Sequence, residues 1–152
     1  MVKLIIFDIM AALSDYAESG ILNLLLRGNT NSFAAPGNVS IALCSGVPAD
    51  SNTGASLPEI KNAGSYARVS LGGPSDGDWD VFTTGGATAN TSTATFPTAT
   101  ANWGVVSGVA IVNNATHGAG QVLFHGKLTT ARTVLNGDTF KFNAGDIDIT
   151  LG

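Results

Sequence analysis

The last third of the chain consists of short apolar or alternating segments that are separated by turns. Val105 to Val112 is almost continuous in apolar side chains, which is typical of a central strand that is buried on both faces. Gln121 to Leu128 follows after an Asn- and Gly-rich turn and predicts its hairpin partner. Asp146 to Leu151 alternates strictly, and this alternation places Ile147, Ile149 and Leu151 in the core. The pattern predicts an antiparallel β-scaffold.

Turn residues divide the preceding part of the chain in the same way. Val39 to Leu43 and Tyr66 to Leu71 alternate and predict two further strands. Asn136-Gly137 accepts the positive φ values of a tight hairpin turn, and it predicts pairing of residues 132–135 with residues 139–142. About eight short strands at this spacing predict a mainly β protein, an antiparallel β-sandwich that is jelly-roll-like and has one N-terminal α-helix.

Residues 15–27 carry the helical pattern of the chain. Asp15 can cap the helix together with Glu18 three residues later, and Gly28 follows as a stop. Apolar side chains at spacings of three and four make one face, which two further leucines widen. We expect this face to pack, either over one end of the domain's own sheet or on another chain.

The first nine residues differ from the rest. Residues 1–9 contain a short apolar run, whereas Met10 begins a more ordinary segment. We therefore divide the chain into an extension at residues 1–9 and a single β-sandwich domain at residues 10–152. The apolar run is too short to span a membrane and lacks the cleavage site of a signal peptide. The extension pairs as an edge strand, reaches a neighbouring subunit or precedes a true start at Met10.

A low charge content adds an expectation about partners. Only 12% of the 152 residues are charged and the formal net charge is −4, so the surface is largely neutral and polar. Such a surface favours coverage by neighbouring subunits, and we expect a homo-oligomer. The chain has no Lys/Arg cluster, which argues against nucleic acid as a partner. Cys44 lies in a strand pattern and is expected to be a small buried residue.

Candidate catalytic and metal-binding residues do not form a recognisable set. His117 and His125 have no Cys or Glu at metal-ligand spacing, and the chain has no Gly-x-Ser-x-Gly elbow. Asp76, Asp78 and Asp80 resemble the start of a calcium loop but lack the Gly and Glu that such a loop needs. We therefore predict no catalytic residue, no metal and no cofactor, and a protein that is not an enzyme.

Several blocks of the sequence carry a family pattern. They are Leu13 to Leu26, Val39 to Leu43, Gly64 to Val69, Phe96 to Val106, Val122 to Leu128, Thr133 to Asp138 and the alternating C-terminal strand. Together they resemble a group of small proteins of tailed bacteriophages and prophages, described as virion structural, tail-fibre-like or head-decoration proteins. The resemblance covers about Met10 to Leu151, and its strongest block runs from Phe96 to Asp138.

The resemblance implies a non-enzymatic structural protein that is located in the virion. The chain has no coiled coil, β-helix repeat or long Gly-rich shaft, which favours a capsid decoration (cement) protein. Such a protein binds the outside of the head shell and bridges subunits of the major capsid protein. The alternative is a tail-fibre or baseplate-associated protein that recognises a host receptor or glycan.

Three elements are predicted to contact the capsid or another partner: the N-terminal extension, the loop at residues 46–64 and the turn at residues 72–80. The candidate contact residues are Val2, Leu4, Ile6, Phe7, Pro48, Asn52, Leu57, Pro58, Pro74, Asp76 and Trp79. A carbohydrate-binding module is a competing class, in which Trp79, Trp103 and Tyr66 would be exposed stacking platforms. We expect Trp103 in the core instead.

Overall fold

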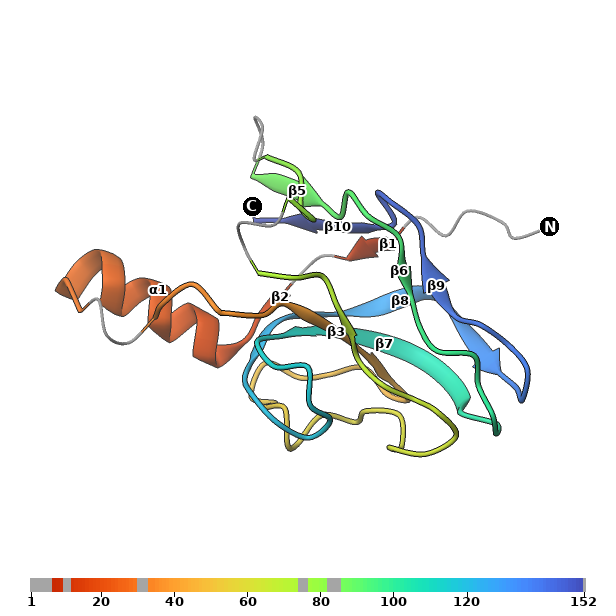
Figure 1. Ribbon diagram of the computed structural model, residues 1–152. Helices are drawn as coiled ribbons and strands as arrows, with labels where there is room; N and C mark the ends of the chain where they lie inside the picture. Colours follow the sequence, from red (N-terminus) through yellow and green to blue (C-terminus); the bar gives the residue numbers. More distant parts are fainter. Residues whose placement is uncertain (1–6, 10–11, 30–32, 74–76, 82–85, 152) are drawn as a thin grey trace.

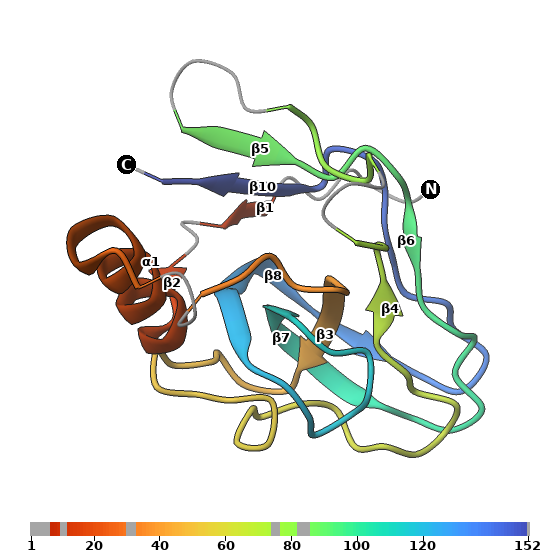
Figure 2. The same ribbon diagram turned by 60° about the vertical axis from the view of Figure 1, so that its left-hand side comes forward.

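The computed structural model describes residues 7–9, 12–29, 33–73, 77–81 and 86–151. These residues form mainly β structure with one helix, in largely antiparallel sheets that do not close into a barrel. Two layers of strands face each other, and the helix extends from one side (Figure 1 and Figure 2). The predicted fold class is therefore confirmed.

The larger layer is a five-stranded sheet with the order β2-β8-β7-β3-β4, in which all neighbours are antiparallel. Its strands are β2 (Ala12–Leu13), β8 (Val122–Val134), β7 (Gly104–Val112), β3 (Ser40–Cys44) and β4 (Val69–Ser70). β7 lies at the centre, and its residues from Gly108 to Val112 are buried, as the continuous apolar run predicts. The predicted hairpin between β7 and β8 is confirmed.

The second layer consists of two smaller sheets. β1 (Phe7–Ile9), β10 (Ile147–Thr150) and β5 (Ala87–Ala89) form one of them in the order β1-β10-β5, with β1 parallel to β10. β6 (Ala94–Thr95) pairs with β9 (Lys141–Phe142) in the other. In Figure 1 these strands lie above and to the right of the five-stranded sheet. Apolar side chains of both layers meet between them in one continuous core.

Aromatic rings fill much of this core. The ring centroids of Phe140 and Phe142 lie 5.2 Å apart, and Phe96 lies 5.9 Å from the first and 6.2 Å from the second. Tyr66 stacks on Phe96 at 6.3 Å, and Trp103 packs edge-on against Tyr66 at 5.3 Å. Edge-on and stacked geometries are the favoured ones for aromatic pairs, and these rings bury a large apolar area between the layers.

The helix α1 (Asp15–Arg27) has the predicted boundaries, but its cap is Ser14 and not Asp15. The Ala17 N–H donates to Ser14 Oγ at 3.2 Å, and Ser14 Oγ donates in turn to the Val122 carbonyl of β8. The buried serine therefore caps the helix and also fixes its first turn to the sheet. Gly28 ends the helix at φ 62°, a left-handed conformation that glycine adopts without strain.

The predicted hairpin at Asn136-Gly137 is wrong in its pairing. The turn itself forms, with Gly137 at φ 90°, but its N–H donates to the Ala99 carbonyl at 2.8 Å. Within the described strands, residues 132–134 belong to β8 and pair with β7, whereas β9 pairs with β6. A turn signal fixes the local backbone, and burial of Phe142 of β9 decides which strand becomes the neighbour.

Two other strand predictions also differ from the structure. Leu151 is 48% exposed and does not lie in the core, because β10 ends at Thr150 and only Ile147 and Ile149 face inward. The alternation from Tyr66 to Leu71 gives a strand of two residues, because β4 pairs with β3 only through Val69 and Ser70. Alternation alone therefore predicted the inward face better than the strand ends.

Candidate functional site

α1 presents leucine side chains to solvent. Its inner face is narrow: Ala17 and Gly20 are buried, and a Cβ added at Gly20 would lie 2.3 Å from the ring of Phe33. Its outer face carries three exposed leucines in the second half of the helix, Leu22 (57%), Leu25 (72%) and Leu26 (79%). In Figure 1 the helix begins beside the sheets and runs away from them. An exposed apolar group of this kind favours contact with a partner.

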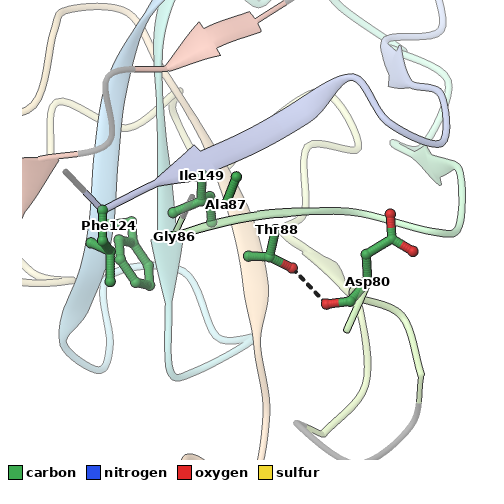
Figure 3. Close-up of a pocket in the computed structure, with 7 residues that line it drawn as sticks. Asp80, Gly86, Ala87, Thr88, Phe124 and Ile149 are labelled. Carbon is green, nitrogen blue, oxygen red and sulfur yellow. Dashed lines mark hydrogen bonds between the residues drawn. The ribbon is translucent and has the colours of Figure 1, made fainter. Parts of the chain in front are cut away.

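An apolar pocket of about 410 Å³ lies between the small β5 sheet and β8 (Figure 3). We call it the β5 pocket, and it is lined by Asp80, Gly86, Ala87, Thr88, Phe124, Ile149 and Leu151. Thr88 Oγ1 donates to the Asp80 carbonyl at 2.8 Å, and the Asp80 N–H donates to the Ala89 carbonyl at 2.8 Å. These bonds hold the wall that carries Asp80 against β5.

A second hollow of about 500 Å³ adjoins the β5 pocket and shares Asp80, Ala87 and Thr88 with it. It adds Asp148 and Val81, and Val81 is 86% exposed. Asp80 and Asp148 are both exposed. Asp148 lies on the opposite face of β10 from Ile149, so Asp80 is the acidic residue in the lining of the β5 pocket, whose interior is apolar.

The N-terminal extension contributes an edge strand. Residues 7–9 form β1, which pairs with β10 in the register Phe7 to Ile147 and Ile9 to Ile149. For residues 7–9 this pairing is that of an edge strand, the first of the alternatives for the extension. Three of the predicted contact residues, Val2, Leu4 and Ile6, lie outside the described residues.

The loop at residues 46–64 is bonded to itself and to the body of the protein. Pro48 is buried, and Pro58 is half-buried with its carbonyl accepting from the Ser45 N–H at 2.8 Å. The Asn52 side chain accepts from the Ala49 N–H at 2.8 Å, and Leu57 packs on a buried cluster behind β3. Contact of these residues with a partner stays a prediction. The internal hydrogen bonds give the loop a fixed surface to which a partner could bind.

Of the predicted contact residues in the turn at residues 72–80, the structure describes Trp79. Pro74 and Asp76 lie outside the described residues. Trp79 is half-buried against the core, and its Nε1 is the buried side-chain atom for which no hydrogen-bond partner is found among the described residues. Tyr66 is 3% exposed and therefore cannot serve as a stacking platform for a sugar. Trp103 packs against the core, as predicted, and its Nε1 donates to the Gly64 carbonyl at 2.8 Å.

A buried polar group that the sequence did not reveal joins the loops below the five-stranded sheet. We call it the Glu59 cluster, and it contains Glu59, Tyr66, Arg68 and His117. Both carboxylate oxygens of Glu59 accept from the Arg68 guanidinium, at 2.9 and 2.8 Å, and Tyr66 Oη donates to the same carboxylate at 2.9 Å. The side chains of Arg68 and Glu59 are 0% and 3% exposed. A bidentate Arg–carboxylate pair is the geometry that compensates best for burial.

Arg68 also binds the backbone of two loops. Its Nη1 donates to the carbonyls of Asn114 and Ala119 at 2.9 and 2.8 Å, while His117 Nε2 lies 3.0 Å from the Ile60 carbonyl. The cluster thus ties residues 46–64 to residues 113–120. Arg68 lies in the alternating segment from Tyr66 to Leu71, on the same face as the buried Tyr66. This position is the sequence signal that could have predicted a buried arginine.

Burial near the Glu59 cluster raises the pKa values of two neighbouring side chains, Cys44 and Tyr66. Burial raises the pKa of the Cys44 thiol from its ordinary value of 9.0 to about 12, with a smaller contribution from the Glu59 carboxylate. Burial and the same carboxylate raise the pKa of Tyr66 well above its ordinary range. Cys44 therefore stays a neutral thiol near pH 7, and its predicted place as a buried strand residue is confirmed.

His125 and Asp50 form a further pair of titratable side chains. His125 Nε2 lies 2.9 Å from Asp50 Oδ1. Within the described part of the chain, no three His, Cys, Asp or Glu side chains are grouped so that they could hold a metal ion. The one described helix is also too short to cross a membrane.

The chain matches a known protein family. A family model described as Gp80, podophage GP4 fiber I protein gp80, matches residues 12–150. The matched region includes α1, the Glu59 cluster and the β5 pocket except for Leu151, whereas β1 lies before it. No protein of curated function matches the chain.

Proposed function

Because this chain belongs to the podophage GP4 fiber I protein gp80 family, which is a family of phage virion structural proteins, we propose that it is a structural subunit of a phage tail fibre. The observation that carries the proposal is the extent of the match, which covers residues 12–150 and therefore almost the whole described fold. In this role the protein is non-enzymatic and works by making contacts within the virion.

The distribution of polar groups supports a structural role. Arg68 and Glu59, the ion pair of the Glu59 cluster, are paired by internal hydrogen bonds, and their side chains are almost closed to solvent. The exposed features include apolar side chains on α1 and an apolar pocket with Asp80 in its lining. Such features suit binding between subunits rather than attack on a substrate.

Capsid decoration is the second candidate, and the compactness of the fold favours it. The described residues form two packed layers and one 13-residue helix, without a coiled coil or an elongated shaft. A plug of this shape fits a cement protein that bridges subunits of the major capsid protein. Because the family is described as a fibre protein, we prefer the tail-fibre role to capsid decoration.

Immunogold electron microscopy of intact virions distinguishes the two roles. An antibody against this protein should label the tail or its fibres if the first proposal holds. Label spread over the head shell would replace it with decoration, and virions without label would remove both. A virion that lacks the gene provides the control for antibody specificity.

A further inference from the structure

We propose that the second half of α1 docks into the β5 pocket of a second copy of this chain. The docking element is the leucine end of α1, which we define as Leu22, Leu25, Leu26 and Arg27. The proposal concerns contact between copies, and it holds whether those copies lie in a fibre or on the head.

The two surfaces match in their apolar character. The leucine end exposes side chains that are 57–79% accessible, although leucine normally gains from burial. The β5 pocket provides an apolar cavity of about 410 Å³ with Phe124 and Ile149 in its walls. This volume is within the range of about 300–1,000 Å³ that is usual for sites that enclose a small apolar group.

The two surfaces are also complementary in charge. Arg27 stands next to the exposed leucines at the C-terminal end of the helix. Asp80 is exposed and belongs to the lining of the β5 pocket. Entry of this end of α1 brings the guanidinium towards Asp80. Entry of the other end would instead bring Asp15 and Glu18 towards it, which like-charge repulsion opposes.

The occupant is a second copy because α1 is held away from its own pocket. Ser14 anchors the first turn to the Val122 carbonyl, and Phe33 packs against Tyr16 and Gly20 on the inner face. The leucines therefore point outward, and no residue of α1 lines the β5 pocket of the same chain. Each chain carries both the leucine end and the β5 pocket, at different places on its surface. Two copies can therefore dock reciprocally in a dimer, or several copies can dock one onto the next around a ring.

Cross-linking of engineered cysteines tests the geometry directly. We would mix a Leu26→Cys variant with a Thr88→Cys variant that carries a tag to shift its mass, and oxidise the mixture. The buried native Cys44 has a pKa of about 12 and does not compete. We expect a mixed disulfide-linked dimer that forms faster than either variant links to itself.

A Leu135→Cys variant is the matched control, since Leu135 is 51% exposed but lies in the turn after β8. Leu135→Cys should form a disulfide with Thr88→Cys about tenfold more slowly than Leu26→Cys does. A thiol that docking does not position meets its partner only by random collision. Equal rates for Leu26→Cys and Leu135→Cys would overturn the proposal. Faster self-linking of Leu26→Cys would replace it with helix-to-helix pairing.

Charge reversal tests the partner surfaces in the unmodified fold. Sedimentation of the native chain between about 10 μM and 1 mM covers the affinities that a small interface gives, and we expect mass above the monomer at the upper end. Arg27→Asp and Asp80→Arg should each raise the dissociation constant about three- to tenfold, and the two together should restore it. A native chain that stays monomeric, or a double variant no better than the singles, contradicts the docking.

Discussion

Around Glu59 every strong polar group is paired inside the chain, whereas on α1 three leucine side chains face solvent. The first region joins two loops through a bidentate ion pair and several backbone carbonyls. The second has a narrow inner face, closed by Phe33, and a broad outer one without cover. Both regions belong to the same matched family domain.

The contrast separates scaffold from contact surface. A buried polar network is costly to leave incomplete, so its members fix loop geometry and are poor candidates for exchange with a partner. Exposed apolar side chains have the opposite property, because they gain free energy when another surface covers them. Substitutions should therefore affect the stability of the fold at the first region and association at the second.

The largest effect is expected from Arg68→Met. This change leaves the Glu59 carboxylate buried without its cation, and the free energy of unfolding should fall by about 3–5 kcal/mol. Denaturant-induced unfolding, followed by tryptophan fluorescence, measures the loss. The double variant Glu59→Met with Arg68→Met should lose less than Arg68→Met alone, and a single variant as stable as the native chain would show that the cluster does not hold the loops.

Gly54→Ala tests the packing of the loop against residues 113–120. A Cβ at Gly54 would lie 2.0 Å from the Ala119 carbonyl oxygen, so the backbone must shift, and we expect a loss of about 1–3 kcal/mol in thermal or denaturant unfolding. Gly37→Ala is the control, because a Cβ there meets no atom within 4 Å. Equal stability of the two variants would mean that the loop moves freely.

The Cys44 thiol should make stability depend on alkaline pH. Its folded pKa of about 12 exceeds the ordinary value of 9.0, so above pH 9 the unfolded chain releases a proton that the folded chain retains. The stabilisation is complete below pH 9 and declines as the pH rises towards 12. Between pH 9 and pH 10 we expect a loss on the order of 1 kcal/mol, as one unit of such a shift implies.

Unfolding titrations of the native chain and of Cys44→Ala at pH 8, 9 and 10 measure this slope. The variant should lose the part of the slope that the thiol supplies, whatever its stability at pH 8. A native slope that the variant reproduces would assign the pH dependence to other groups.

The smallest effect on stability is expected on α1. Leu26→Asp places a carboxylate at a position that is 79% exposed, and the free energy of unfolding should stay within about 0.5 kcal/mol of the native value. The same variant should lose the self-association seen by sedimentation. A large loss of stability would show that Leu26 packs within the fold, and the contrast between the two regions would then fail.

The sequence predicted the elements whose signals are local. α1 has the predicted bounds and ends at the glycine that indicated its stop, although its cap is Ser14, and β7 is the central strand that its apolar run predicted. The inward positions of Ile147 and Ile149 also followed from alternation. A period or a cap depends on neighbouring residues alone, so one sequence is enough to show it.

Tertiary structure alone decided which of these elements meet. The partner of β9, the exposure of Leu151 and the pairing of Arg68 with Glu59 each depend on segments that are distant along the chain. The β5 pocket likewise joins residues of β5, β8 and β10, which share no pattern in the sequence. Local preference determines the shape of a segment, and the burial of its side chains against the rest of the fold determines its neighbours.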